Sequence, residues 1–577
     1  MIDSRLTRRG LLGAAALGGI GLAWPGLLPA WARTGSHGIA AKDFATLTGQ
    51  EIALAVANSA FTVDGRRGHA VTINGTLPAP LLRLREGQNV RLAVTNHLDE
   101  DTSIHWHGLL VPFTMDGVPG VSFPGIRPHE TFVYEFPVRQ SGTYWYHSHS
   151  GLQEQQGHYG PIVIDPAGED PVAADREHVV LLSDWSFLHP HQIFSRLKQE
   201  GGFFNRQRLT LLGAREGEPR LSREDREMFA RARMDPTDIA DVTAAAYTYL
   251  INGHSPDENW TGLFRPGERV RLRIINAAAM TIFNLRIPDL PLTVVGTDGQ
   301  LVRPVEVDEL QIAPAETYDL VVTPAADRAF TIVAESIDRS GLARATLAPR
   351  LGMVAPVPPL RERPLLGMAD MGMGGMDHGS GHGGGHGAAA GHDMDMRDES
   401  RVGFPVGVGV DMIAPNPVDR TGDPGIGLEN VGHRVLTYRD LVALTPNRDS
   451  RPPSRTVDVH LTGNMERFMW SFDGVKFSEG AEPIRFARDE RVRVRLINDT
   501  MMSHPIHLHG HFFEIVNGHG PHQPLKHTVN VLPGSVTAFD VTADAPGDWA
   551  FHCHLLLHMH AGMMRVVTVR PLGGEAA

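Results

Sequence analysis

The sequence has very little cysteine: Cys553 is the only one among 577 residues. One cysteine cannot form a disulfide within the chain, so crosslinking is excluded as a source of stability. After the N-terminal region we find no apolar run of about 20 residues, the length that a spanning helix needs. Basic residues are also too few, 53 Lys and Arg against 66 Asp and Glu, for a nucleic-acid-binding surface. The value of Cys553 must therefore lie in the chemistry of its sulfur.

The N-terminus has the pattern of an export signal. Thr7-Arg8-Arg9-Gly10-Leu11-Leu12 precedes an apolar run to Ala23, and Ala30-Trp31-Ala32 has the small-x-small form of a cleavage site. A membrane anchor is the alternative, but the run is shorter than about 20 residues and Pro25 follows it. We predict a twin-arginine signal peptide over residues 1–32, recognised by the Tat export machinery, and a periplasmic protein without a membrane span.

Metal-binding side chains surround the cysteine. His552-Cys553-His554 is followed by His558 and Met563, which gives a thiolate, an imidazole and a thioether at five-residue steps. A cysteine and two histidines with a weak axial methionine form a blue-copper site. The second histidine can come from the upstream stretch His504-Pro505-Ile506-His507-Leu508-His509-Gly510.

Strand alternation divides these residues between two sites. His552 and His554 share one face of a strand, whereas Cys553 points to the other. By the same parity His507 and His509 share a face and His504 lies opposite, although Pro505 makes strict alternation uncertain there. We predict a one-copper centre formed by His504, Cys553, His558 and Met563. The other side chains, His507, His509, His552 and His554, are predicted to face a second metal centre.

A strand-like repeat occurs three times, at residues 87–96, 267–276 and 489–498, each with the alternation of a half-buried strand. A second short motif, which starts with a proline, also occurs three times, at Pro128, Pro314 and Pro533. With short strands and Gly/Pro turns between the motifs, the pattern predicts three β-sandwich domains.

The repeats also test which positions hold metal. Nine residues after the Asn that ends each repeat lie His105, Leu285 and His507, in chain order. Nineteen residues after each Pro lie His147, Val333 and His552. The second residue of each pair in the middle copy is Ile287 or Glu335, and Ser148 stands in the first copy where Cys553 stands in the third. The middle domain is therefore predicted to have the fold without the ligands, and only the third to hold the blue copper.

Four His-x-His pairs thus come from the first and third domains. The pairs are His105/His107, His147/His149, His507/His509 and His552/His554. A single pair is usually an ordinary polar strand face, but four pairs at matched offsets argue against that interpretation. Eight imidazoles suit three coppers clustered at a domain interface, and closed tetrahedral zinc sites fit this arrangement less well.

These motifs resemble the multicopper oxidases, whose C-terminal signature is His-Pro-x-His-Leu-His-Gly followed by His-Cys-His-x3-His-x4-Met. Residues 101–108 and 142–151 and a Met/His-rich insert are similar to the bacterial periplasmic CopA-type copper-resistance oxidases. The resemblance implies an all-β fold of three cupredoxin-like Greek-key β-sandwich domains. The expected ranges are 43–167, 175–350 and 401–577.

The resemblance also implies four copper ions as cofactors. His105 and His507 are expected at the type 2 ion, and the cysteine with its partners at the type 1 ion. The type 3 pair is expected to bind His107, His147, His149, His509, His552 and His554. The implied reaction reduces dioxygen to water with electrons from Cu(I) or a phenolic reductant, and periplasmic copper-handling proteins are possible partners.

Two segments depart from the β pattern. Residues 190–245 are predicted to contain a helical insertion in the middle domain, with a helix start at Ser222-Arg223-Glu224-Asp225 and charges on a solvated face. Residues 366–400 are rich in Met, His and Gly, a composition that predicts disorder. A plain linker is one interpretation of this segment. Copper capture is the favoured one, since thioethers select Cu(I).

Other residues near the motifs carry further predictions. Asp116 resembles the acidic residue that follows the His-Trp-His-Gly motif in relatives and delivers protons, but it could equally be a turn residue before Gly117. Relatives with a Glu after the type 1 histidine differ here, where Met559 stands. Four further histidines are predicted to be surface or packing residues: His511, His519, His522 and His527.

Three functions are therefore open. We expect an enzyme that oxidises Cu(I) with dioxygen in copper resistance. The alternatives are a laccase-like phenol oxidase and a copper-sequestering periplasmic protein. A complete ligand set favours an enzyme, because storage alone does not require a bridge between two metal centres.

Overall fold

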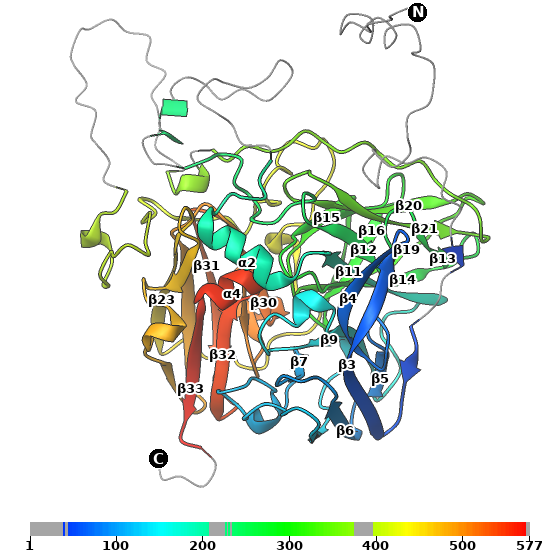
Figure 1. Ribbon diagram of the computed structural model, residues 1–577, viewed down its shortest axis with the longest axis horizontal. Helices are drawn as coiled ribbons and strands as arrows, with labels where there is room; N and C mark the ends of the chain where they lie inside the picture. The colour runs from blue at the N-terminus through cyan, green and yellow to red at the C-terminus, as the bar shows by residue number, and fades with distance from the viewer. Residues whose placement is uncertain are drawn as a thin grey trace, which may run out of the picture.

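The computed structural model describes residues 39–40, 44–206, 226–227, 229–230, 234–367, 369–373 and 396–572. The predicted signal peptide, residues 1–32, lies outside this part of the chain. Within it the fold is almost entirely β, as Figure 1 shows. No helix in the described ranges is long and apolar enough to cross a membrane.

The first domain consists of two sheets with a common core. Its strands are β2 (Thr46–Leu47), β3 (Glu51–Val63), β4 (Arg66–Ile73), β5 (Leu81–Arg85), β6 (Asn89–Asn96), β7 (His105–His107), β8 (Thr131–Pro137), β9 (Gly142–His147) and β10 (Tyr159–Asp165). The sheet orders are β4-β3-β6-β8 and β2-β5-β10-β9-β7. Buried residues from both sheets, such as Leu92 of β6 and Tyr146 of β9, belong to one apolar cluster.

The middle domain has two six-stranded sheets. Its strands are β1 (Ile39–Ala40), β11 (Arg176–Trp185), β12 (Thr248–Ile251), β13 (Trp260–Leu263), β14 (Val270–Asn276), β15 (Phe283–Arg286), β16 (Leu292–Thr297), β17 (Gln300–Val307), β18 (Glu309–Ile312), β19 (Thr317–Val322), β20 (Phe330–Ser336) and β21 (Leu342–Ala348). The orders are β12-β11-β14-β19-β16-β17 and β1-β13-β21-β20-β15-β18.

The third domain repeats this plan. Its strands are β22 (Val418–Asp419), β23 (Arg455–Asn464), β24 (Met469–Phe472), β25 (Ile484–Ala487), β26 (Arg491–Asn498), β27 (His504–Leu508), β28 (Phe513–Ile515), β29 (Leu525–Lys526), β30 (Thr528–Val531), β31 (Ser535–Thr542), β32 (Gly547–Cys553) and β33 (Met564–Arg570). One sheet has the order β24-β23-β26-β31-β28-β29 with β22 against β31, and the other has the order β25-β33-β32-β27-β30. The predicted all-β class is confirmed.

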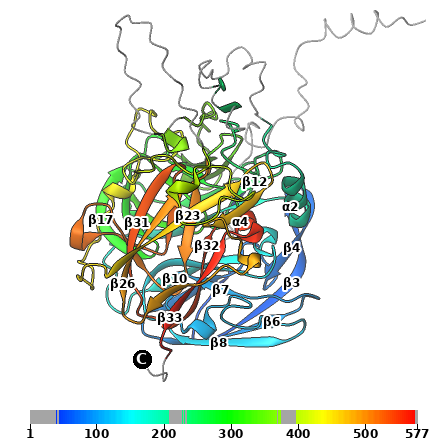
Figure 2. The same cartoon turned by 90° about the vertical axis from the view of Figure 1, so that its left-hand side faces the viewer.

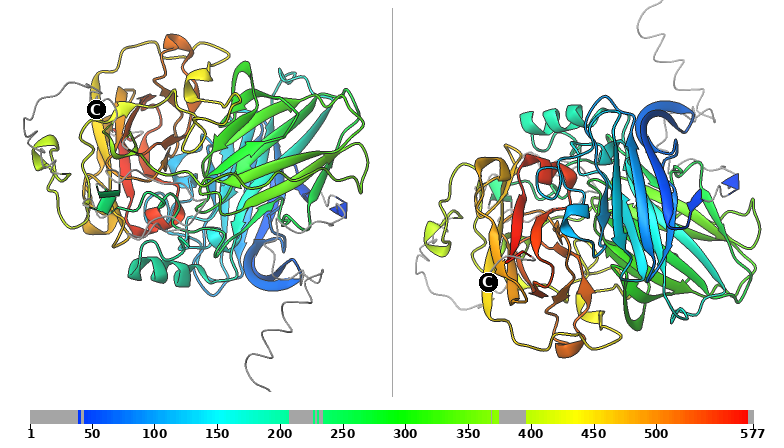
Figure 3. Two further views of the ribbon diagram at one scale, coloured as in Figure 1. Left: turned by 90° about the horizontal axis from the view of Figure 1, so that it is seen from above. Right: turned by 90° about the horizontal axis from the view of Figure 1, so that it is seen from below.

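Figure 3 shows how the domains lie: the third, in yellow to red, is on one side, and the first and middle are together on the other. The buried carboxylate of Asp319 on β19 accepts a hydrogen bond from Thr143 of β9, 2.6 Å long, and joins the middle domain to the first. The middle domain is therefore in direct contact with the first domain.

The repeated strands β6, β14 and β26 each end on a buried asparagine that fixes the following loop. The Asn96 side chain donates to the carbonyl oxygens of Glu100 and Ile126, at 2.8 and 2.9 Å. Asn498 donates likewise to Met502 and Val531, at 2.7 and 3.0 Å. A buried amide satisfies its donors only in one loop geometry. The repeat thus sets where β7 and β27, the histidine strands, begin.

Two helices, one from the predicted insertion and one from the third domain, lie next to each other. They are α2 (Pro190–Gln199), which begins the predicted helical insertion, and α4 (Leu556–Ala561). The helices lie side by side in Figures 1 and 2, and the rings of Phe194 and His560 are 4.8 Å apart. The predicted helix start at 222–225 lies outside the described residues. Pro190 at the first turn and buried Ile193 and Leu197 explain where α2 forms and how it packs.

The ends of the Met/His-rich segment differ from the expected disorder. Met371 and Met373 are buried in an apolar cluster with Met412 and Met501. These thioethers contact apolar neighbours from elsewhere in the fold, a possibility that local composition could not reveal. The stretch 374–395 lies outside the described residues.

Candidate metal centres

The histidine motifs lie on two equivalent pairs of strands. His105 of β7 is paired with His147 of β9, and His507 of β27 is paired with His552 of β32. Ile506 is paired with Cys553, so the cysteine points to the opposite face from His507 and His552. His504 has the parity of Ile506 and thus shares the cysteine's face. The register therefore agrees with the division predicted from alternation.

On that face lies the cysteine group, which we define as His504, Cys553, His558 and Met563. The Cys553 sulfur is 3.5 Å from His504 Nδ1 and 3.9 Å from His558 Nδ1, and the two nitrogens are 3.2 Å apart. Met563 is buried beside them, and its carbonyl oxygen accepts from the Cys553 N–H at 3.1 Å. One sulfur and two ring nitrogens thus converge on a single buried point.

The outer nitrogens of these two rings have polar partners. His504 Nε2 is 2.7 Å from the Thr500 hydroxyl, and His558 Nε2 is 2.7 Å from the Asp241 carboxyl. Burial raises the pKa of the Asp241 carboxyl to about 8 and lowers the pKa of the His558 imidazole well below its ordinary value. Such partners fix the ring orientation and direct Nδ1 toward the sulfur.

On the opposite face lies the histidine cluster, defined as the eight residues of the four His-x-His pairs. Rings from the first and third domains face one another across the interface. His107 stacks on His507 with ring centres 3.9 Å apart, and His105 lies at the same distance from His509. All the pairs are therefore brought together at one domain interface.

Hydrogen bonds determine which ring nitrogen of two cluster histidines is free to bind a metal. His105 Nδ1 is 2.7 Å from the Asp116 carbonyl oxygen, and His507 Nδ1 is 2.6 Å from the His527 carbonyl oxygen. A carbonyl only accepts, so each Nδ1 has the hydrogen and each Nε2 has a lone pair. Both Nε2 atoms are buried and have no hydrogen-bond partner among the described residues. Such orphaned atoms need an explanation, and a bound metal ion provides one.

The Nε2 atoms of His509 and His552 give further evidence for a metal site. His509 Nδ1 is 2.8 Å from an Asp116 carboxylate oxygen, and His552 Nδ1 is 3.0 Å from the Cys553 carbonyl oxygen. With those hydrogens placed, the two Nε2 lone pairs face each other at 3.0 Å. Two acceptors cannot form a hydrogen bond, and a metal ion bound by both nitrogens would remove the repulsion between their lone pairs. The cluster residues thus fit metal ions.

Burial favours the neutral form of four cluster imidazoles, the form that a metal ligand needs: His107, His149, His507 and His552. Burial, followed by repulsion from neighbouring rings, lowers the pKa of the His107, His149 and His507 imidazoles well below the ordinary value. Burial lowers the pKa of His552 to about 4. Burial also raises the pKa of the Cys553 thiol well above its ordinary value, so a thiolate there requires a cation beside the sulfur.

Two carboxylates lie against the cluster. Asp116 is completely buried and contacts His509 of the third domain through a carboxylate oxygen and His105 of the first through its backbone. The next residue, Gly117, has φ 83°, and a Cβ there would lie 1.8 Å from the Ile104 carbonyl oxygen. Only glycine fits this turn, so Asp116 is also the turn residue that the sequence suggested. Glu154, which the sequence motifs did not identify, is 2.7 Å from His147 Nδ1.

The middle domain has apolar side chains where the others have histidines. Leu285 on β15 is buried in the core and is paired with Ala334 on β20. Val333, which has the repeat offset of His147 and His552, is paired with Arg286, so the strand register of the middle domain differs by one residue from that of the other two. Glu335 is buried too, but its carboxylate is paired with Arg339 and Arg361, the latter at 2.7 Å. At these positions the middle domain forms core and ion pairs.

Three contacts were missed or misjudged from the sequence. Asp241 lies in the insertion whose charges were expected to be solvated, yet it is buried against His558. His527, expected to be a packing or surface residue, is buried in contact with His507, and the Thr528 hydroxyl is 3.3 Å from both His507 and His107. No repeat or spacing marks these residues. Only the folded arrangement identifies them.

Comparisons with known proteins agree with this geometry. Three family models, each described as multicopper oxidase, match residues 55–169, 223–349 and 450–573. Copper resistance protein A of Pseudomonas syringae pv. tomato is 48% identical, over 98% of this chain and 100% of that protein. Copper resistance protein A of Escherichia coli is 47% identical, over 98% and 99%.

Among solved structures, Fet3p, a multicopper oxidase that functions in iron import, has a TM-score of 0.65 at 21% identity and 91% coverage of both chains. At that identity the likeness supports the cupredoxin-like fold. The family models and the high identity to the copper resistance proteins support more than the fold. The chain belongs to the multicopper oxidase family.

Proposed function

We propose that the protein oxidises Cu(I) to Cu(II) with dioxygen as part of copper resistance. The reaction consumes four Cu(I), one O₂ and four protons, and yields four Cu(II) and two waters. The family supports a copper-dependent oxidoreductase that uses oxygen, and the relatives named copper resistance protein A support a role in copper resistance. Export through residues 1–32 by the Tat route would place the reaction in the periplasm. The proposed domain ranges remain 43–167, 175–350 and 401–577.

The proposal includes four resident copper ions. The cysteine group would hold the type 1 ion, and His105 and His507, with their free Nε2 lone pairs, the type 2 ion. The remaining cluster residues would hold the type 3 pair: His107, His147, His149, His509, His552 and His554. When bound, these ions would supply one-electron storage at several metals, so that dioxygen can receive four electrons without release of partly reduced oxygen.

The observation that supports an oxidase most directly is the position of Cys553. Its side chain belongs to the cysteine group, while its two neighbours in the sequence belong to the histidine cluster. Covalent bonds of one short stretch thus connect the two sets of donor atoms. A protein that only stored copper would gain nothing from this connection.

Asp116 has the position that a proton-delivering residue requires. Its buried carboxylate contacts His509 and lies 3.3 Å from His105 Nδ1, so it touches both domains that form the cluster. Dioxygen reduction consumes protons inside a buried site, where few groups can hold one. Within the proposal Asp116 delivers protons to the cluster, in addition to its role in the turn.

A cavity next to the cysteine group favours Cu(I) as the substrate. Its volume is about 570 Å³, and its wall includes Thr500, the hydroxyl of which contacts His504. Four methionines line it: Met234, Met412, Met465 and Met501. The carboxylates of Asp235, Asp411 and Asp499 are also part of the wall. Thioethers select a soft monovalent copper ion and carboxylates attract its charge, whereas a phenol would gain little from this lining.

The ends of the Met/His-rich segment support the same interpretation. Met373 and Met396 belong to the apolar cluster that also contains Met412, Met465 and Met501. The described residues on either side of 374–395 therefore pack in the same cluster as three methionines of the cavity wall. Copper that this segment bound would be held at a high local concentration beside the cavity.

The test is the triple substitution Met234→Leu, Met412→Leu and Met465→Leu. Leucine keeps volume and removes the thioether. We expect kcat/KM for Cu(I), measured by oxygen uptake, to fall at least about tenfold, because three of the four thioethers in the cavity wall are lost. Oxidation of a phenolic dye and the copper content should not change. Met353→Leu, outside the cavity, is the matched control.

Two outcomes would contradict the proposal. Equal losses with Cu(I) and with the dye would show that the cavity does not select copper, which favours a laccase-like enzyme. A parent protein that binds variable amounts of copper and consumes no oxygen on addition of Cu(I) would favour the sequestering function.

A further inference from the structure

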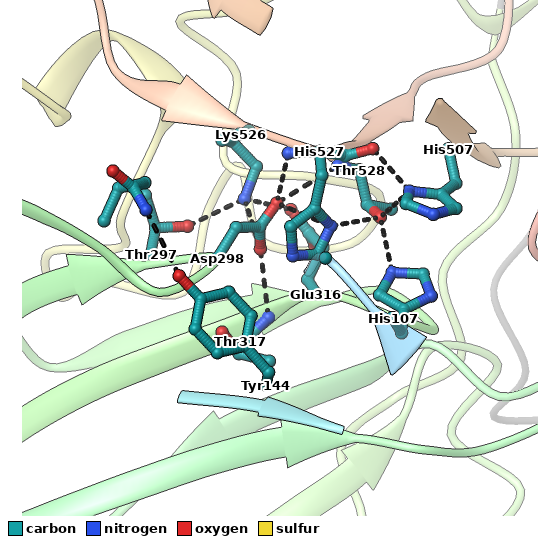
Figure 4. A network of polar contacts seen from close by, with 12 residues as sticks. His107, Tyr144, Thr297, Asp298, Glu316, Thr317, His507, Lys526, His527 and Thr528 are labelled. Atoms are coloured by element: carbon teal, nitrogen blue, oxygen red, sulfur yellow. Dashed lines mark hydrogen bonds and ion pairs between the residues drawn. The ribbon is translucent and has the colours of Figure 1, made fainter. Parts of the chain in front are cut away.

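A buried charged network lies between the middle and third domains, as Figure 4 shows. Lys526 of β29 is completely buried, and its ammonium group is 3.1 Å from Asp298 and 3.1 Å from Glu316, both in the middle domain. It also donates to the Thr297 hydroxyl at 2.7 Å. Three oxygens therefore satisfy the three donors of this ammonium group.

The Asp298 carboxylate connects this network to the third-domain backbone. One oxygen contacts Lys526, and the other accepts from the backbone N–H groups of His527 and Thr528, each at 3.1 Å. Burial alone would raise the pKa of the Asp298 carboxyl, but the Lys526 charge holds that pKa below its ordinary value. Asp298 therefore stays an anion, and it can hold two amides in one orientation.

Asp298 is itself held firmly. It has a positive φ of 46°, a conformation that Asp and Asn tolerate better than other residues with a Cβ. Its N–H donates to the Thr317 carbonyl oxygen at 2.9 Å, and its side chain accepts from the Thr317 N–H at 3.1 Å. The carboxylate is thus fixed relative to the middle-domain sheet.

The segment that Asp298 holds contacts cluster residues from both other domains. The His527 carbonyl oxygen accepts from His507 Nδ1 at 2.6 Å. The Thr528 hydroxyl is 3.3 Å from His507 Nδ1 and 3.3 Å from His107 Nε2. These partners determine the ring orientations and keep the hydrogen of His507 on Nδ1, which leaves the lone pair on Nε2.

We propose that Asp298 is a positioning residue through which the middle domain, which has no ligands of its own at the cluster, orients His507 and His107 for the cluster metals. This inference rests on the proposed function only in taking the cluster histidines as copper ligands. Lys526 and Glu316 balance the charge of the carboxylate. Loss of such an outer partner weakens metal binding by about 10- to 100-fold.

The test variant is Asp298→Asn, which tolerates the positive φ but has one oxygen in place of two and no charge. The matched control is Asp319→Asn: Asp319 is also a buried interdomain carboxylate, 2.7 Å from Arg271, and it accepts from Thr143, which is not a cluster residue. Copper per chain after dialysis against a chelator, the type 2 electron paramagnetic resonance signal and the blue absorption are measured for each.

We expect Asp298→Asn to lose cluster copper about 10- to 100-fold more readily than the parent and to change the type 2 signal, with the blue absorption retained. Asp319→Asn should alter stability alone. If Asp298→Asn matches Asp319→Asn in copper content and signal, the network is an interdomain contact only and the inference is wrong. A parent without cluster copper would instead overturn the proposed function.

If Asp298→Asn does not fold, a second variant, Thr528→Val, tests the ring contacts directly. Valine has the shape of threonine without the hydroxyl, so the Asp298 contacts to the backbone remain. We expect a changed type 2 signal with normal stability, because both ring contacts at 3.3 Å are lost. A signal identical to that of the parent would contradict the inference.

Discussion

The strand pairs β7–β9 of the first domain and β15–β20 of the middle domain come from copies of one repeat, yet they have different roles. The first presents His105 and His147 toward the third domain, whereas the second buries Leu285 and Ala334 in its own core. The middle domain contacts both metal centres from outside, through Asp241 at His558 and Asp298 at the segment behind His507. A copy of the fold can therefore lose every ligand and still determine how ligands elsewhere are oriented.

The largest effect expected from this comparison is at Cys553, whose side chain belongs to the cysteine group and whose sequence neighbours belong to the histidine cluster. Cys553→Ser should abolish the blue absorption and the oxidase activity, because serine removes the thiolate that the type 1 site requires. The histidine cluster should stay largely loaded, since its donor atoms are unchanged. Absorption spectra and metal analysis of the purified variant check this result. A retained blue band would show that Cys553 is not a type 1 ligand.

A pair of substitutions at equivalent repeat positions contrasts the two domains. His105→Ala should abolish dioxygen reduction while the blue centre remains, because the cysteine group lies wholly in the third domain. Leu285→Ala should leave copper content unchanged and lower the free energy of unfolding by about 2–5 kcal/mol, as a large-to-small change in a core does. Reoxidation by air after reduction, metal analysis and denaturant unfolding distinguish them. Normal reoxidation of His105→Ala would remove that residue from the cluster.

A smaller effect is expected where the middle domain contacts the cysteine group. Asp241→Leu removes the hydrogen-bond partner of His558 and should lower Cu(I) turnover about tenfold, within the range for such outer partners. Asp241→Asn keeps a hydrogen-bonding group of the same shape and should be affected less. Oxygen uptake and the reduction potential of the blue centre are the measurements. The type 2 signal should be unchanged in both, and a change there would mean that Asp241 acts on more than His558.

The sequence by itself determined the ligand types and the repeat. A cysteine between two histidines, followed by His and Met at five-residue intervals, has few chemical uses. Comparison of equivalent positions in the three repeats identifies the middle copy as the one without ligands. Alternation in a strand is a local property, so the separation of Cys553 from His552 and His554 could be predicted without the fold. The sequence also predicted three β-sandwich domains, because the repeat's strand pattern is short and complete within each copy.

Tertiary structure decided the contacts that link residues far apart in the chain. Asp241 and Asp298 contact His558 and the His527–Thr528 backbone across domain boundaries, and no spacing relates these partners. Burial of Met371 and Met373 contradicted an expectation based on composition, because neighbours from elsewhere in the fold cover them. The orientation of a ring and the position of its hydrogen depend on which acceptor lies behind it, and that acceptor is set by the packing of whole domains.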